Sequence, residues 1–455
     1  MRRQRTAGAI GVSCLLVLLA ACGSDDKKAD ETSAPTTAAA TATTVAAATT
    51  AAPTETTAEA TETTAEATET TAATETTAGS DDTATDDTAT NDSGSQQADG
   101  VPAELGDGEG EVNLVAWAGY TEDGTTDPEV DWVTPFEEET GCKVNVKLGN
   151  TSDEMVQLMQ TGEYDGVSAS GDATTRLIEG GEVAPVNTDL IPNYADVFDG
   201  LKLQPWNSVD GQAYGVPHGR GANLLVYNTE AFAEAPSSIK VMFEDSPAAG
   251  KLSVYDSPIY IADAAIYVMA TQPDLGITNP YALDQTQFDA VIEALTTQKD
   301  LVSQYWSLYT DQQAELAAGT VLAGTTWQVI VGLAQTDRAK IEAVKTTEGA
   351  TGWSDTWMIS SKAKHPNCMY MWMNHIISPE ANAAVAEWFG EAPANAKACA
   401  ITSEGFCDQY HAEDESYWED VWYWTTATEE CIDGRTDVKC VPYSDWVTAW
   451  TELRA

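Results

Sequence analysis

Aromatic residues are absent from the first hundred positions of this chain, and this limits where a hydrophobic core can form. All 14 Trp, 16 Tyr and 7 Phe of the 455 residues lie after residue 100. From Ser24 to about Gly100 the chain consists largely of Thr, Ala, Glu and Asp in near-repeats, with no periodic apolar face. Such a segment cannot bury enough surface to offset the entropy of ordering it. We therefore expect a disordered stalk over residues 23–105, followed by a folded region.

The first 22 residues are typical of a secretory signal. Three arginines precede an apolar run that is too short to span a bilayer as a permanent helix. The run closes with Leu19-Ala20-Ala21-Cys22, which resembles the lipobox of bacterial lipoproteins. That resemblance implies that Cys22 is acylated and anchors the protein to the outer face of the cell membrane.

The charge balance excludes one large class of partner. The sequence carries 72 acidic against 22 Lys and Arg residues, a formal net charge of −50. Nucleic-acid binding requires clustered basic side chains, so we expect no nucleic-acid partner. The negative field favours cationic ligands.

Six cysteines follow the anchor position, and an even number in an exported protein indicates disulfides. Cys431 and Cys440 enclose a turn-like stretch, so we expect them to pair. Six cysteines allow fifteen connectivities. There is no Cys-x-x-Cys motif and the four histidines are scattered, so we expect no metal site.

Strand and helix patterns alternate after residue 110, which predicts an α/β fold with a largely parallel sheet. Ligands of such sheets bind beyond the carboxyl ends of the strands, here at 117–120 and 168–172. Neither a Gly-rich phosphate loop nor a Gly-x-Ser-x-Gly elbow occurs, so we expect neither a cofactor nor an enzyme. The expected strands are 111–117, 143–147, 164–168, 222–228, 251–255, 321–327 and 357–360, and the expected helices are 132–140, 152–160, 172–180, 261–271, 285–298, 311–319, 367–377 and 379–389.

From about Val112 to Asn395 the order of motifs resembles the extracellular solute-binding proteins of ABC importers, and among them the spermidine/putrescine-binding branch. The motifs that carry the resemblance are Trp117-x-x-Tyr120, Glu139-Thr140-Gly141-Cys142-Lys143-Val144, Tyr164-Asp165-Gly166-Val167, Tyr214-Gly215-Val216-Pro217, Ser378-Pro379-Glu380 and Gly390-Glu391-Ala392-Pro393-Ala394-Asn395. The segment from Ala396 onward departs from the family, and we expect its Trp418, Trp422 and Trp424 to pack the tail.

The resemblance implies a type II periplasmic-binding-protein fold, with two lobes and a ligand cleft between them. Lobe one is expected at 106–217 and 329–376, and lobe two at 218–328 and 377–455. The same assignment places Cys142 and Cys368 in one lobe, so we expect them to form a disulfide. Cys399 and Cys407 are then left to form the third pair.

The resemblance also implies the site residues. Matched positions in the family enclose a polyamine between aromatic walls and hold its ammonium groups with acids. In this sequence they are Trp117, Tyr120, Ser170, Trp327, Trp353 and Asp355. The family's two further acids fall on Ser257 and Tyr260, so we expect the neighbouring Asp256 to substitute, while Arg220 could bring a base into the cleft or pair the lobes.

We therefore expect a monomeric, lipid-anchored solute-binding protein that delivers a small amine to an ABC permease. A monoamine, a short diamine or a zwitterion fits one matched acid better than a long polyamine does. The alternatives are a carboxylate or amino-acid ligand, a ligand-sensing lipoprotein, and an extracellular enzyme.

Overall fold

The computed structural model describes residues 102–455. The expected signal peptide, the acylated Cys22 and nearly all of the expected stalk lie outside the described residues. Within residues 102–455, no helix is both long enough and apolar enough to cross a membrane.

The first of two large sheets has seven strands in the order β13-β6-β12-β3-β1-β2, and β14 also pairs with β12. The chain forms parallel pairs at one edge, β1 with β2 and with β3, while β12 runs antiparallel to β3 and β6. The strands are β1 (Glu111–Ala116), β2 (Lys143–Leu148), β3 (Gly166–Ala169), β6 (Val216–Ala222), β12 (Ala350–Ile359), β13 (Ala392–Pro393) and β14 (Val421–Tyr423).

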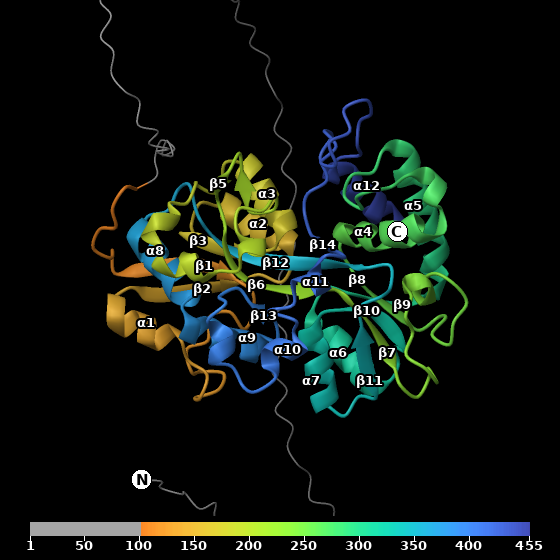
Figure 1. Ribbon diagram of the computed structural model, residues 1–455, viewed down its shortest axis with the longest axis horizontal. Coiled ribbons are helices and arrows are strands. Elements are labelled where there is room, and N and C mark those ends of the chain that lie inside the picture. The colour runs from red at the N-terminus through yellow and green to blue at the C-terminus, as the bar shows by residue number, and fades with distance from the viewer. Residues whose placement is uncertain (1–101) are drawn as a thin grey trace, which may run out of the picture. The chain divides into compact units, whose positions relative to one another are not determined.

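Helices cover both faces of this sheet and complete what we call the first lobe (Figure 1). Local signals define them: the Thr151 hydroxyl accepts the Glu154 N–H at the start of α2, and α1 stops at Gly141 in the left-handed conformation. The helices are α1 (Val133–Thr140), α2 (Ser152–Gln160), α3 (Gly171–Glu179), α8 (Pro366–Ile376) and α9 (Pro379–Phe389). Their apolar faces and the sheet share one buried core.

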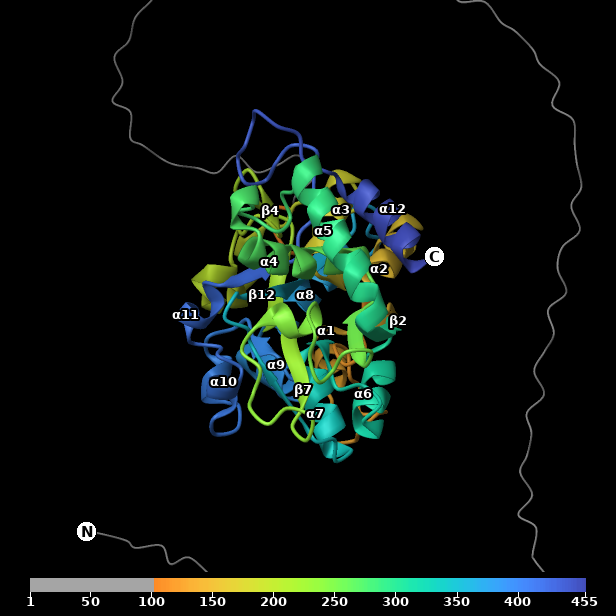
Figure 2. The ribbon, with the colours of Figure 1, turned by 90° about the vertical axis from the view of Figure 1, so that its right-hand side faces the viewer.

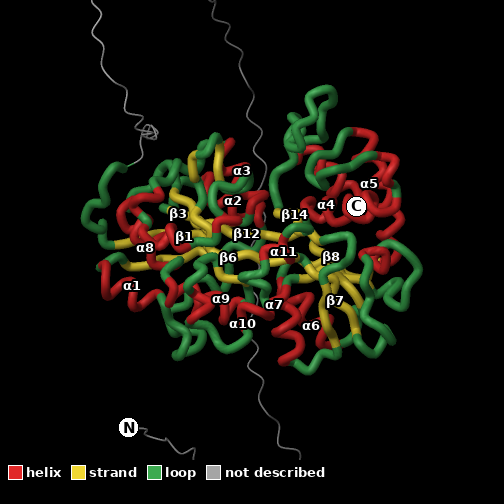
Figure 3. Tube along the Cα trace, viewed as in Figure 1, coloured by secondary structure: helices red, strands yellow, loops and turns green. Residues whose placement is uncertain are grey.

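The second large sheet has five strands in the order β11-β7-β10-β8-β9 and, with its helices, forms the second lobe (Figure 3). Its strands are β7 (Leu224–Asn228), β8 (Leu252–Tyr255), β9 (Val302–Trp306), β10 (Ala323–Thr326) and β11 (Ile341–Val344). Its helices are α4 (Ile261–Thr271), α5 (Gln285–Gln298), α6 (Tyr309–Ala318), α7 (Gln328–Thr336) and α12 (Tyr443–Arg454).

Smaller elements fill the connections. They are the β4–β5 hairpin (Ser208–Val209 and Gln212–Ala213), the short helices α10 (Phe406–Gln409) and α11 (Glu415–Trp418), and the 3-10 helices η1 (Thr188–Leu190), η2 (Pro192–Asp196), η3 (Asp199–Leu201), η4 (Ile239–Met242), η5 (Pro258–Tyr260), η6 (Pro273–Leu275), η7 (Lys299–Leu301) and η8 (Ala398–Ala400).

The chain passes between the two sheets at three places: Asn223, residues 345–349, and the segment after β14. These differ from the expected crossings near residues 217, 328 and 377. The first crossing comes later in the chain than expected, at Asn223 after the end of β6. The side-chain amide of Asn223 donates to the Thr351 hydroxyl at 2.7 Å. The second lobe retains α7 because its apolar side packs into that lobe's core, and the first lobe retains α9 for the same reason.

The tail after α9 serves both lobes. It first adds β13 and β14 to the first sheet, and then α12 packs beside α5 in the second lobe (Figure 2). Tyr443, Trp446, Trp450 and Leu453 of α12 are part of that lobe's buried core.

Three disulfides are formed: Cys142–Cys368, Cys399–Cys407 and Cys431–Cys440. All three expected pairings are therefore confirmed. The first joins the start of β2 to α8 across a sequence separation of 226 residues. The two-lobed α/β architecture is confirmed as well.

Candidate functional site

A cavity of about 680 Å³ lies between the lobes. The first lobe contributes the segments that follow the carboxyl ends of β1 and β3, and the second lobe contributes those that follow β9 and β10. Such strand ends are where α/β sheets place ligands.

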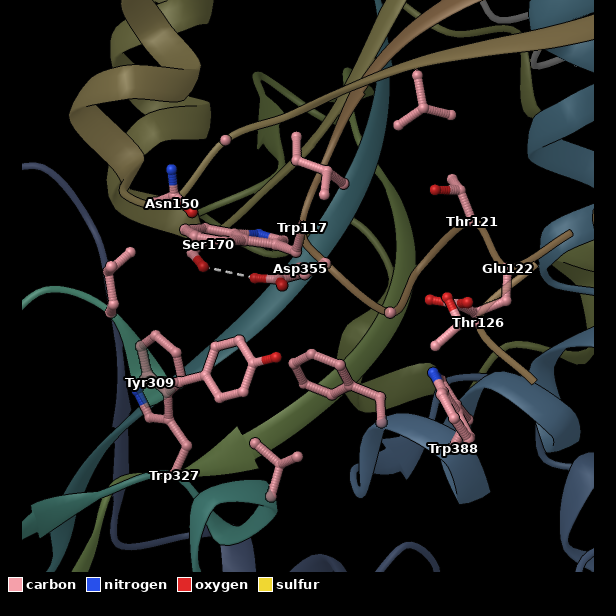
Figure 4. A pocket seen from close by; sticks show the side chains of 18 of the residues that line it. Trp117, Thr121, Glu122, Thr126, Asn150, Ser170, Tyr309, Trp327, Asp355 and Trp388 are labelled. Carbon is pink, nitrogen blue, oxygen red and sulfur yellow. Dashed lines mark hydrogen bonds between the residues drawn. The ribbon is translucent and has the colours of Figure 1, made fainter. Parts of the chain in front are cut away.

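Aromatic side chains from both lobes line the cavity (Figure 4). Trp117 of the first lobe meets Trp327 of the second in an edge contact, with ring centroids 6.5 Å apart. Trp306 and Tyr255 pack behind Trp327, at 5.0 and 5.5 Å. The aromatic lining residues are Trp117, Tyr309, Trp327, Trp353, Trp388, Phe389 and Trp424.

The charged lining residues are all acidic. Glu122, Asp123 and Asp355 border the cavity, and the described residues that line it include no Lys, Arg or His. Aromatic faces and carboxylates both attract cations, the first through the ring quadrupole and the second by charge.

Asp355 is the deepest of the three acids, with only 3% of its surface exposed. It lies on β12, where a bulge shifts the pairing with β6 between Asp355 and Thr356. The Ser170 hydroxyl donates to its Oδ1 at 2.5 Å, and the Tyr120 hydroxyl lies 2.9 Å from its Oδ2. Burial raises the pKa of Asp355 to about 6, although both hydrogen bonds work against that shift.

Tyr120 stands behind the cavity wall rather than in it. Its side chain is fully buried, and its hydroxyl contacts Glu391 Oε2 at 2.9 Å as well as Asp355. Tyr120 therefore supports Asp355 from behind the wall through this hydrogen bond. Of the other predicted residues, Trp117, Ser170, Trp327, Trp353 and Asp355 all line the cavity.

Arg220 and Asp256 are not brought to the cavity. The guanidinium of Arg220 is buried against the tail, 2.7 Å from Glu415 Oε1 and 4.3 Å from the centre of the Trp418 ring. Asp256 accepts hydrogen bonds from Arg454 and from the Trp450 indole of α12, each at 3.0 Å. Both partners belong to the segment from Ala396 onward, which holds none of the motifs that carry the resemblance, so those motifs could not indicate these contacts.

Sequence reasoning also missed several residues at or behind the cavity. Trp424, expected to pack the tail, lines the cavity and stacks on Tyr255 with a centroid distance of 5.8 Å. Glu391 lies inside a motif that carried the resemblance, but only the fold brings it to Tyr120. Trp388 and Phe389 end α9, and Tyr309 follows β9, a strand that the sequence did not predict.

The positions of the family's two other acids lie away from the cavity lining. The Ser257 hydroxyl accepts the Ile259 N–H at the start of η5, and the Tyr260 hydroxyl accepts from the Gln298 amide at 2.8 Å. Both side chains have structural partners. In the part of the chain that the structure describes, no group of three or more His, Cys, Asp or Glu residues is arranged to hold a metal ion.

Comparisons with known proteins agree with the two-lobed fold. The family model described as bacterial extracellular solute-binding protein matches residues 131–413. The spermidine/putrescine-binding periplasmic protein 1 of Haemophilus influenzae is 22% identical over 272 residues, which cover 58% of this chain and 70% of the relative.

Solved structures share the fold at low identity. The PotD substrate-binding protein of a spermidine/putrescine ABC transporter from Streptococcus pneumoniae aligns with a TM-score of 0.60 and 17% identity, covering 76% of this chain and 99% of that one. The TpPotD lipoprotein of Treponema pallidum aligns with a TM-score of 0.57 and 15% identity, covering 75% and 99%.

Proposed function

Since the chain belongs to the bacterial extracellular solute-binding proteins, we propose that it captures a small cationic amine and delivers it to an ABC permease. The observation that carries this proposal is the cavity lining, in which aromatic rings surround acids and no basic side chain occurs among the described lining residues. The names of the related spermidine/putrescine-binding proteins support the same class of ligand.

The number of buried acids favours a ligand with one deeply held ammonium group. Asp355 is the buried acid, whereas Glu122 is half-buried and Asp123 is exposed. A buried ammonium needs a carboxylate and further polar partners. Asp355 with Ser170 supplies these at one point, so we expect a monoamine or a short diamine rather than a long polyamine.

A carboxylate or zwitterionic ligand is the less favoured alternative. An Arg220 guanidinium in the cleft would favour such a ligand, because a guanidinium binds a carboxylate well. That guanidinium pairs with Glu415 instead. Transport rather than catalysis is the proposed role.

Thermal unfolding with a ligand panel tests the proposal. We expect butylamine or putrescine to raise the melting temperature and glucose to leave it unchanged. Asp355→Asn should weaken amine binding roughly tenfold to a hundredfold, the effect of losing a charge-assisted hydrogen bond. Asp256→Asn is the matched control, because its carboxylate contacts the tail and not the cavity. Stabilisation by glucose alone, unchanged in Asp355→Asn, contradicts the amine proposal.

Lipid anchoring through Cys22 is a second part of the proposal. It is supported by the Leu19-Ala20-Ala21-Cys22 motif and by the structural relative that is itself a lipoprotein. Cys22→Ala should move the protein from the membrane fraction to the medium or periplasm. If the Cys22→Ala variant stays in the membrane fraction, the anchor lies elsewhere in the chain.

Import and sensing use the same capture step and are separated by a transport assay. Deleting the gene should abolish uptake of the labelled amine if the protein serves a permease. Unchanged uptake with a lost transcriptional response to the amine would instead assign it to a sensor.

A further inference from the structure

Behind the cavity wall, a single phenol hydroxyl bridges two buried carboxyl groups. The Tyr120 hydroxyl oxygen lies 2.9 Å from Asp355 Oδ2 and 2.9 Å from Glu391 Oε2. Tyr120, Asp355 and Glu391 are all at most 3% exposed. Burial and the two neighbouring carboxyl groups raise the pKa of Tyr120 well above its usual range, so the phenol keeps its proton.

Two full, linear hydrogen bonds in this trio require one extra proton. A phenol has one O–H, and a linear hydrogen bond uses it for only one of two carboxyl oxygens. The second contact is a hydrogen bond only if that carboxyl group is itself protonated and donates to the phenol oxygen. With both hydrogen bonds fully formed, one of the two carboxyl groups is a neutral acid.

The surroundings of the two groups differ. Asp355 borders the cavity and accepts a second hydrogen bond from Ser170. Glu391 does not border the cavity, and its Oε1 has no hydrogen-bond partner among the described residues. Burial and the nearby Asp355 raise the pKa of Glu391 well above its usual range. These surroundings therefore favour an ionised Asp355 and a protonated Glu391.

The neighbouring histidine supplies no positive charge to Glu391. His218 Nδ1 lies 3.0 Å from the Trp357 indole nitrogen, and an indole N–H can only donate. The histidine is therefore the neutral tautomer with its proton on Nε2, which faces Glu391 Oε1 at 3.4 Å. Burial lowers the pKa of His218 to about 3, so it stays neutral.

Among the described residues, no basic group shifts the pKa of either carboxyl group through its charge. Tyr410 lies near Glu391, and Asp172 and Tyr255 lie near Asp355. The backbone also makes room for the acid, because a Cβ on Gly219 would lie 2.4 Å from the Glu391 carboxyl carbon.

We propose that Glu391 is a positioning residue: as a neutral acid it donates to Tyr120, which in turn donates to Asp355, so that a bound ligand meets one fixed negative charge. The part that concerns the ligand rests on the proposed amine-binding function. The protonation of Glu391 does not, and it can be measured in the free protein.

Infrared spectroscopy tests the protonation directly, because a neutral carboxyl group has a carbonyl band above those of carboxylates. At pH 8 we expect this band to be lost in Glu391→Gln and kept in Asp355→Asn. Asp263 is a second buried carboxyl group, with a pKa of about 7, so Asp263→Asn is the background control. A band lost in Asp355→Asn but kept in Glu391→Gln, or one unaffected by Glu391→Gln, overturns the proposal.

Affinity measurements test the positioning. With butylamine as the probe, Glu391→Gln should bind within about twofold of the natural protein, because an amide also donates to the phenol oxygen. Glu391→Met has a similar volume but no donor, and should bind about fivefold more weakly, as expected for one lost neutral hydrogen bond. Adding Glu391→Met to Tyr120→Phe should weaken butylamine binding little further, since both changes remove the same hydrogen-bonded connection to Asp355.

Two outcomes contradict the positioning role: a large loss of affinity in Glu391→Gln, which would mean that Glu391 carries a charge the ligand needs, or full additivity with Tyr120→Phe. If neither butylamine nor putrescine binds the natural protein, the proposed function fails, and the infrared experiment still decides the state of Glu391.

Discussion

At the scale of single residues, burial decides which carboxyl groups of this acidic protein carry charge. Asp355 keeps two hydroxyl donors and an opening to the cavity, so it can hold a charge that a ligand neutralises. Asp263 of α4 lies in the interior with one hydroxyl partner, Thr351 at 3.0 Å. The same type of side chain therefore borders the cavity in one place and lowers stability above its pKa in the other.

Replacing Asp263 by Asn should stabilise the protein as the pH rises. Burial raises the folded-state pKa of Asp263 to about 7 from 3.8. Between these values the folded state holds a proton that the unfolded state has lost, so stability falls as the pH rises through this window. Asp263→Asn does not ionise. Its gain in unfolding free energy should grow from near zero at pH 4 to a few kcal/mol, as an order of magnitude, at pH 8.

Denaturant unfolding at the two pH values checks this prediction, with the exposed Asp300→Asn as control. A gain that is the same at both pH values would show that Asp263 does not titrate in this window.

Two glycine-to-alanine changes should have opposite effects. A Cβ on Gly171, at the start of α3, would lie 2.0 Å from the Trp424 carbonyl oxygen, so Gly171→Ala should destabilise by about 1–3 kcal/mol. Gly332 lies on the exposed side of α7 with nothing within 4 Å of its Cβ, so Gly332→Ala should stabilise by about 0.5–1 kcal/mol. Chemical denaturation of both variants compares them, and equal effects would refute the close approach of the tail to α3.

At the scale of elements, helices with clear end signals were predictable and irregular strands were not. The bounds of α4, α5 and α9 agree with the expected ranges, and α5 begins with the Asp284–Gln287 capping box. All ten residues of β12 are buried, so it lacks the alternation that marks a strand. The strand β6 contains Pro217 and two glycines, which usually indicate a loop.

The reason for one of those glycines became visible only in the fold. A Cβ on Gly221 would lie 2.4 Å from the Trp353 ring, so the glycine makes room for a cavity wall. Of the aromatic and acidic residues that line the cavity, Trp117, Trp327, Trp353 and Asp355 could be predicted from the family motifs, and their role in binding stays a prediction. The partners of Arg220 and Asp256 could not, because they lie in a tail whose docking no local pattern specifies.

The disulfides should differ in what their removal costs. Replacing Cys142 and Cys368 by Ser opens a sequence separation of 226 residues, against 9 for Cys431 and Cys440. Loop-closure entropy predicts a loss of about 5 kcal/mol for the first pair and about half of that for the second. Denaturant unfolding of the two double variants ranks them, and a larger loss for the short loop would show that local packing outweighs chain entropy.

At the scale of the whole molecule, the net charge of −50 should act on the rate of ligand capture. A strongly negative surface attracts a cation over distances that salt shortens, with a screening length of about 10 Å at 0.1 M and about 3 Å at 1 M. Association of butylamine, followed by stopped-flow tryptophan fluorescence, should slow roughly tenfold between low and high salt, while dissociation changes less. An association rate that does not depend on salt would show that the negative field of the protein does not speed ligand capture.

The path of the tail also has a consequence for the order in which the protein can be completed. The core of the second lobe includes Tyr443, Trp446, Trp450 and Leu453, which all lie in the last thirteen residues. The first sheet likewise lacks two of its strands until β13 and β14 have been made. Synthesis proceeds from the N-terminus, so the first lobe cannot be completed before β14 has been made, nor the second before α12 has been made. A nascent chain must keep large apolar surfaces from aggregating until α12 has been made, and a premature stop between β14 and α12 would leave the second lobe without part of its core.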